Sequence, residues 1–149
     1  MSLNEFDLQV RSHIYDACLR RGRPPLVEEL SSLLNTTEQQ VQGALTNLAE
    51  AHMMVLQSDG GEILMAQPFS AVPTPFLVET AQFSCYANCI WDGLGVAAML
   101  HQDVHIQTSC ADCGQALELQ VIGGEVRGLD GVIHFALPAR RWWADIVFT

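Results

Sequence analysis

Residues 85–100 read CYANCIWDGLGVAAML and predict the main helix in the second half of the chain. Cys85 and Cys89 lie four residues apart in this segment, and Asp92 follows three residues later. Because each residue of an α-helix advances about 100°, the three side chains would fall within roughly 60° of one another. The segment therefore predicts one helix face that carries two thiols and a carboxylate.

This face has two interpretations. In the first, the cysteines pack as small buried hydrophobic residues and Asp92 is a surface residue or a helix cap. In the second, the thiols bind a soft metal, for which thiolates are preferred ligands, and the start of the helix lowers the pKa of a thiol. A carboxylate beside buried thiols is costly unless it has a partner or a task, which favours the second interpretation.

The segments around this helix alternate in the manner of short strands. They are residues 76–84, 103–110, 116–122 and 132–138, with turns expected at 111–115 and 123–131. One helix against several short, antiparallel strands predicts an α+β fold for this half of the chain.

The first half predicts three helices and a β-hairpin. The helices are expected at residues 6–22, 24–35 and 36–53, the last opening with the capping-box pair Thr36 and Gln39, and the hairpin turns at residues 58–61. This order resembles a winged helix. The third helix carries no lysine or arginine and the net charge is −10, so we expect no nucleic acid partner.

A proline-rich stretch separates the two halves. Residues 68–76, PFSAVPTPF, hold three prolines and no charge, which predicts an extended connector. We therefore expect a winged-helix-like helical lobe at 1–67, a connector with the first strand at 68–82, and an α+β lobe at 83–149.

The sequence also indicates the cellular compartment. No apolar run approaches the roughly 20 residues of a membrane span, and the N-terminus has no signal-peptide pattern. Five cysteines, an odd number, indicate free thiols in a reducing compartment. We expect a cytoplasmic protein without a membrane partner.

A C-x-x-C pair, Cys110 and Cys113, occupies the turn expected at 111–115 and its flank. A single pair is half of a zinc site, and Cys85 with Cys89 could in principle complete a four-thiolate set. Structural, metal-binding and redox roles remain open for this pair.

Four blocks of the sequence resemble the organomercurial (alkylmercury) lyase family, from about residue 25 onward. They are PFSAVPTPF, YANCIWDGLG, the C-x-x-C-G turn and HFALPARRWWADI, of which residues 86–92, YANCIWD, are the most specific. The resemblance implies that Cys89 is the mercury-binding thiolate and Asp92 the proton-shuttling carboxylate. The implied reaction is protonolysis of a carbon–mercury bond, which gives a hydrocarbon and Hg(II).

The same resemblance implies no organic cofactor, Hg(II) as product or ligand, and a small organomercurial and thiols as partners. A separate flavoprotein, a mercuric reductase, would reduce the product. The family's second catalytic cysteine would fall at or just past Thr149, and Cys85 is the candidate substitute by geometry. Cys110 matches a family cysteine with a structural role, whereas Cys113 is an additional feature that could hold zinc with it.

A second hypothesis is a non-catalytic thiol protein, a sensor or scavenger of Hg(II) or another soft metal. It would bind the metal through Cys89 with Cys85, or through Cys110 with Cys113.

Overall fold

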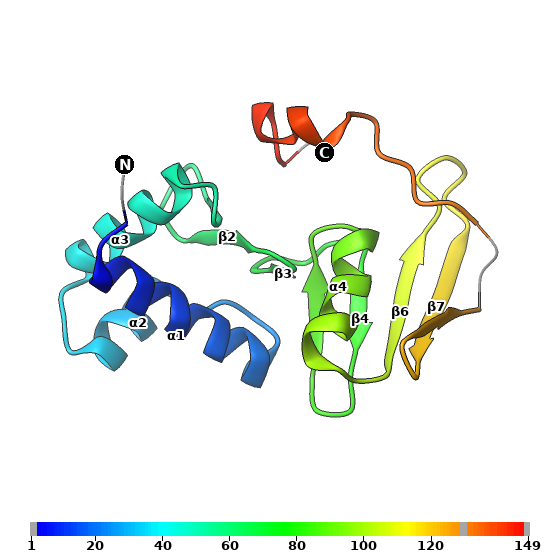
Figure 1. The fold of residues 1–149 in the computed structure, drawn as a ribbon, viewed down its shortest axis with the longest axis horizontal. Helices are drawn as coiled ribbons and strands as arrows, with labels where there is room; N and C mark the ends of the chain where they lie inside the picture. The colour runs from blue at the N-terminus through cyan, green and yellow to red at the C-terminus, as the bar shows by residue number, and fades with distance from the viewer. Residues whose placement is uncertain (1–2, 129–130, 148–149) are drawn as a thin grey trace.

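The computed structural model describes residues 3–128 and 131–147. Three helices gather at one end of the molecule and a fourth packs on the sheet, as Figure 1 shows. The helices are α1 (Glu5–Arg21), α2 (Val27–Leu34), α3 (Glu38–Glu50) and α4 (Ile90–Leu100). Eight strands of the described residues form one antiparallel sheet in the order β1-β2-β3-β5-β4-β6-β7-β8. This arrangement confirms the α+β class.

The strands are short, and most of them lie next to a strand that is close in sequence. Their bounds are β1 (Val55–Leu56), β2 (Ile63–Ala66), β3 (Phe69–Ser70), β4 (Leu77–Glu79), β5 (Ser84–Ala87), β6 (Val104–Ser109), β7 (Ala116–Ile122) and β8 (Glu125–Arg127). The hairpin expected around residues 58–61 is formed by β1 and β2. β3 pairs with both β2 and β5, so the sheet continues from this hairpin into the second half of the chain. The division into lobes at residues 67 and 82 stays a prediction.

Helix caps explain where the N-terminal helices begin and end. Asn4 caps α1, and α1 ends at Gly22, whose φ of +72° suits a residue without a side chain. The capping box of α3 was expected at Thr36, but the capping residue is Thr37, which accepts from the backbone N–H of Gln40. The predicted pair is therefore wrong by one residue, because either threonine fits the pattern and only the backbone geometry selects one.

The start of α4 differs from the sequence prediction. Cys85 lies in β5, where its register partner is Val78 of β4, and not on a helix. The neighbouring Tyr86 pairs with strands on both sides, so the ladders use the backbone groups that a helix would need. The helix begins only at Ile90. The prediction that Cys85, Cys89 and Asp92 share one helix face is therefore wrong.

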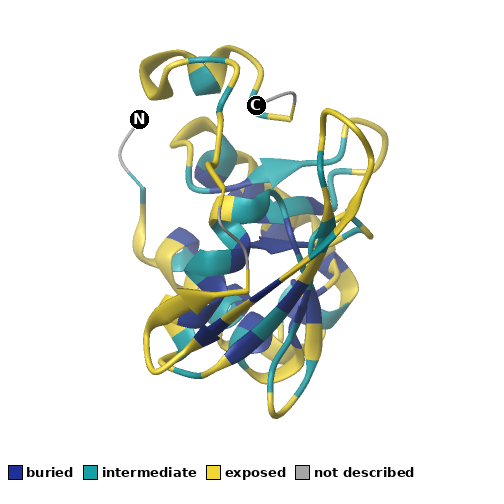
Figure 2. Ribbon diagram, turned by 90° about the vertical axis from the view of Figure 1, so that its right-hand side faces the viewer, coloured by how far each residue is buried: buried dark blue, intermediate teal, exposed yellow. Residues whose placement is uncertain are grey.

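The end of the sheet also differs. The turn at 111–115 lies between β6 and β7 as expected, but the strand predicted at 132–138 is wrong. β8 takes the free edge of β7 instead, through a tight turn at Gly123 and Gly124, both with positive φ. Residues 131–147 form a mostly exposed segment that returns toward the helical end of the molecule (Figures 1 and 2). Within it, Trp143 stacks on His52, which follows α3, with ring centroids 4.2 Å apart.

One hydrophobic core serves both ends of the molecule. It runs from Ile14 and Leu45 of the helices through Phe69 to Val78 and Ile106 of the sheet. In the described part of the chain, no helix combines the length and the apolar character that crossing a membrane requires.

Candidate functional site

Cys89 is the residue on which α4 begins. It has an extended backbone, with φ −150° and ψ 177°, and its Sγ accepts the backbone N–H of Asp92 at 3.4 Å. The thiol thus occupies the N-cap position that serine, threonine or aspartate usually fills. Its side chain is half-buried and lines a cavity of about 770 Å³ together with Ile90 and Leu94 of the same helix. A soft, polarisable group therefore lies at the positive end of a helix and beside a large space.

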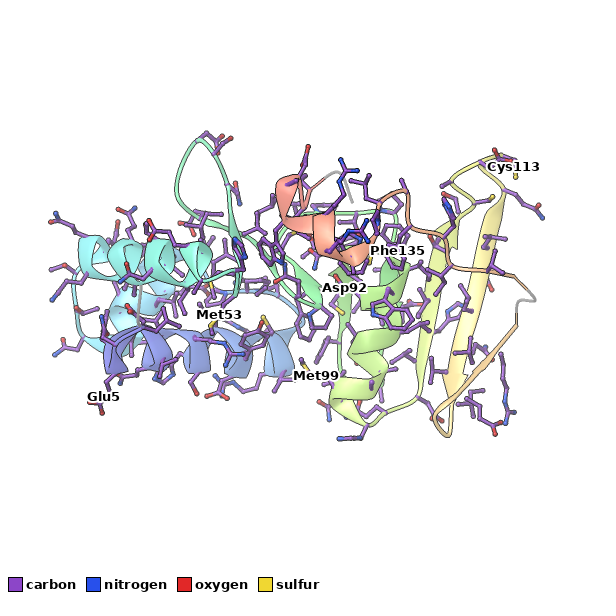
Figure 3. All side chains as sticks on the ribbon, turned by 45° about the horizontal axis from the view of Figure 1, so that its top comes forward. Glu5, Met53, Asp92, Met99, Cys113 and Phe135 are labelled. Atoms are coloured by element: carbon purple, nitrogen blue, oxygen red, sulfur yellow. The ribbon has the colours of Figure 1, made fainter. Side chains whose placement is uncertain are left out.

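Asp92 is held in the first turn of the same helix. Asn88 donates from Nδ2 to the Oδ2 of Asp92 at 2.9 Å. Burial raises the pKa of Asp92 above its ordinary value, and the hydrogen bond from Asn88 lowers it in part. Figure 3 shows Asp92 between the helical end of the molecule and the sheet. A raised pKa makes a carboxyl group a stronger proton acceptor than an ordinary aspartate, which suits a proton carrier.

The pKa of the Cys89 thiol is raised, which contradicts the expected lowering. Burial is the largest cause, and the negative charge of Asp92 adds to it. The backbone N–H groups of Asp92 and Trp91 lower the pKa of the thiol, as a helix start should, but they do not outweigh the loss of solvent. At neutral pH Cys89 therefore rests as a thiol that carries its own proton.

The β6–β7 hairpin and residues 131–135 of the C-terminal segment also line the cavity. Cys110 lines it from the hairpin turn, and Phe135 lines it from the C-terminal segment. Most of the remaining lining is apolar, with Phe76 and Leu119 among its members. Two cysteines, Cys89 and Cys110, thus line one mainly apolar cavity.

Cys85 lies elsewhere, in the core beside Cys18. The side chain of Cys85 is 3% exposed, and burial raises its pKa to about 11. Burial together with the neighbouring Cys85 raises the pKa of Cys18 to about 12. Cys85 is not among the described residues that line the cavity of Cys89. Its assistance to Cys89 stays a prediction.

The structure does not bring the four predicted thiols into one metal site. Among residues 3–128 and 131–147, no group of three or more histidine, cysteine, aspartate or glutamate side chains could hold a metal ion. Zinc bound by Cys110 and Cys113 would therefore have two protein ligands, whereas structural zinc sites have four.

Sequence reasoning missed Tyr15, an α1 residue that lies within the electrostatic reach of Asp92. Its hydroxyl donates to the backbone oxygen of Gln67 at 3.1 Å, and its pKa is raised mainly by burial and in part by Asp92. Nothing in the local sequence indicates this proximity, because Tyr15 and Asp92 are separated by about half of the chain.

Comparison with known proteins decides the family. The family model described as alkylmercury lyase matches residues 69–149, the part that contains Cys89, Asp92 and the C-x-x-C turn. The chain belongs to the alkylmercury lyase family. No curated protein matches it.

A solved structure shows the same fold. It is titled the mercury-bound form of MerB2, and it superposes on this alkylmercury lyase family member with a TM-score of 0.65 and 23% sequence identity. The match covers 85% of this chain and 60% of that protein, so the chain spans about three fifths of its length. At this identity the likeness establishes the fold and no more.

Proposed function

We propose that this protein cleaves the carbon–mercury bond of a small organomercurial by protonolysis, giving a hydrocarbon and Hg(II). The observation that carries the proposal is that Cys89 lines an apolar cavity and that Asp92, whose backbone N–H donates to the Cys89 sulfur, lies in the same helical turn. Membership of the alkylmercury lyase family supports the same chemistry.

The first step is capture of mercury by Cys89. The Cys89 sulfur displaces a ligand from the organomercurial and forms an S–Hg bond. The thiol proton passes to the Asp92 carboxylate, whose raised pKa allows it to hold that proton. The organic group occupies the apolar cavity, where its burial from water favours binding. Asp92 is then a neutral acid beside a mercury-bound carbon.

The second step is cleavage. A thiolate from an external thiol adds to mercury and weakens the Hg–C bond, since thiolates are strong donors to soft metals. The bond breaks with its electron pair on carbon, which takes the proton from Asp92. Asp92 returns to its carboxylate, and Hg(II) remains bound to two sulfurs. Mercury stays in the +2 state throughout, so no reductant is consumed.

Asn88 is a positioning residue in this scheme. Its donor to Oδ2 holds the carboxyl group of Asp92 in place and moderates its pKa, so that the group can both accept and release the proton. We place the reaction in the cytoplasm, with a thiol as cosubstrate and a separate mercuric reductase as the consumer of Hg(II). The N-terminal helices are proposed as a winged-helix-like lobe that does not read DNA.

Isotope labelling tests the protonolysis. Phenylmercuric acetate is incubated with the protein and excess thiol in D₂O, and the benzene is analysed by mass spectrometry. We expect singly deuterated benzene that requires Cys89, with none from a Cys89→Ser variant. If the wild-type protein binds mercury and releases no benzene, the result would support the second hypothesis, a non-catalytic thiol protein that binds Hg(II).

A further inference from the structure

The C-x-x-C turn faces the same cavity as Cys89. Cys110 and Cys89 both line the 770 Å³ space, the first from the hairpin between β6 and β7 and the second from the start of α4. Cys113 is exposed, and Figure 3 shows it at the outer tip of the hairpin. The pair therefore extends from the cavity wall to the solvent.

The turn holds the Cys110 sulfur among hydrogen-bond donors. Two backbone hydrogen bonds close the turn. The N–H of Cys110 donates to the backbone oxygen of Gln115 at 2.8 Å, and the N–H of Gly114 donates to the backbone oxygen of Cys110 at 2.9 Å. Gly114 has a φ of +74°, which a turn of this kind requires. The backbone N–H groups of Cys113 and Asp112, together with the Cys113 thiol, donate hydrogen bonds to the Cys110 sulfur, so the two sulfurs lie close together.

The number of ligands selects the metal. Two thiolates without a third protein ligand suit a soft ion that is satisfied by two sulfurs, as Hg(II) is, and they leave zinc incompletely bound. The rest of the cavity lining is mainly apolar. Cys110 is therefore a second soft ligand in the cavity for a mercury ion that leaves Cys89.

We propose that Cys110 and Cys113 form a two-thiolate acceptor site that takes Hg(II) from Cys89 and presents it to solvent. This proposal rests on the function proposed above, which supplies the Hg(II).

The transfer is a thiol exchange without a change of oxidation state. The Cys110 thiolate attacks mercury that is bound to Cys89 and to an external thiolate, and an S–Hg bond forms as the Cys89–Hg bond breaks. The Cys89 thiolate takes up a proton, and the proton that Cys110 lost has gone to water. Cys113 then loses its proton to the departing external thiolate and replaces it on mercury. Cys89 is left as a free thiol, ready for another substrate.

The first test uses inorganic HgCl₂ alone. One equivalent is added to the full chain, free thiols are labelled with N-ethylmaleimide, and each cysteine is quantified by peptide mass spectrometry. We expect Cys110 and Cys113 to be protected at least tenfold relative to the metal-free protein. Full labelling of both cysteines would overturn the proposal. A Gln115→Ser variant is the matched control, since it changes an exposed side chain of the same turn and keeps both sulfurs.

The second test concerns transfer. With phenylmercuric acetate and limiting thiol, a Cys110→Ser/Cys113→Ser variant should show steady turnover reduced about tenfold, restored by excess thiol, because the external thiol must then remove mercury from Cys89 directly. Gln115→Ser should turn over as the wild type does. Protection by HgCl₂ without an effect on turnover would contradict the transfer. If the wild type releases no benzene at all, the proposed function has failed, and the HgCl₂ labelling alone decides the acceptor site.

Discussion

The backbone N–H of Asp92 donates to the Sγ of Cys89 at 3.4 Å, so the proposed mercury ligand and the proposed proton carrier share the first turn of α4. Neither residue can move far without breaking the start of the helix. This coupling explains why a cysteine occupies a position that oxygen-bearing side chains usually cap. It also keeps Asp92 within one helical turn of the Cys89 sulfur.

Removal of the Asn88 amide should change the pH dependence of turnover. Its hydrogen bond lowers the pKa of Asp92, so Asn88→Ala should raise that pKa further. Because Asp92 must start as a carboxylate to receive the thiol proton, the acid limb of the pH–rate profile should move to higher pH. We expect a turnover loss of about tenfold at neutral pH. Benzene release between pH 5 and 9 measures it, and an unmoved acid limb would remove Asn88 from the scheme.

The five thiols should differ in reactivity. Cys110, with a lowered pKa, should react first with iodoacetamide at neutral pH, and Cys89 more slowly. Cys85 and Cys18 should stay unmodified in the folded protein, because they are buried and their pKa values are raised to about 11 and about 12. Timed alkylation with peptide mass spectrometry gives the order. Rapid labelling of Cys85 would contradict its burial and revive it as the second thiol at Cys89.

The end of α1 should tolerate no side chain at Gly22. A Cβ there would lie 2.5 Å from Phe83 Cδ2 and 2.9 Å from the backbone oxygen of Ser84. Gly61 has a nearly equal positive φ but nothing within 4 Å of its Cβ position, so it isolates the cost of backbone strain. We expect Gly61→Ala to lower the free energy of unfolding by about 1 kcal/mol and Gly22→Ala by about 3 kcal/mol or more. Urea unfolding measures both, and equal losses would show that the contact with β5 relaxes.

Glu29 should stabilise the helical end above acidic pH. The Glu29 carboxylate forms ion pairs with Arg21 at 2.7 Å and with Arg23 at 3.0 Å. These arginines, of which Arg23 contributes most, lower the pKa of Glu29 to about 2. A lowered folded-state pKa contributes stability above the ordinary value of 4.5 that is lost as the pH falls toward 2. Because the pair is largely exposed, Glu29→Gln should cost only about 1 kcal/mol at neutral pH. The difference between the two proteins should vanish near pH 2; a difference that persists there would rule out the ion pair as its origin.

Local signals predicted the elements that are decided locally. The Ser-Asp-Gly-Gly turn placed the β1–β2 hairpin, and the glycine after Cys113 agrees with the turn between β6 and β7. The placement of Cys85 failed because its strand exists only through partners in β3 and β4, which a local helical period does not reveal. The strand predicted at 132–138 failed for a related reason, since β8 already occupies the edge of β7.

The same distinction between local signals and distant packing applies to the candidate site. Cys89 and Asp92 are three residues apart, so their proximity followed from spacing and from the family resemblance. The shared cavity of Cys89 and Cys110, and the proximity of Tyr15 to Asp92, depend on how distant segments pack. The raised pKa of Cys89 is likewise a consequence of burial that no local pattern announces.

The most direct test of the account compares the wild type with Asp92→Asn in a single turnover of phenylmercuric acetate. Intact-protein mass spectrometry follows phenylmercury bound at Cys89, and gas chromatography follows benzene. Asparagine keeps the size of the side chain and the helix start but cannot carry the proton. We predict that both proteins bind phenylmercury and that Asp92→Asn releases benzene at least a hundredfold more slowly. Equal rates of benzene release would contradict the account, because the proton would then reach carbon without Asp92.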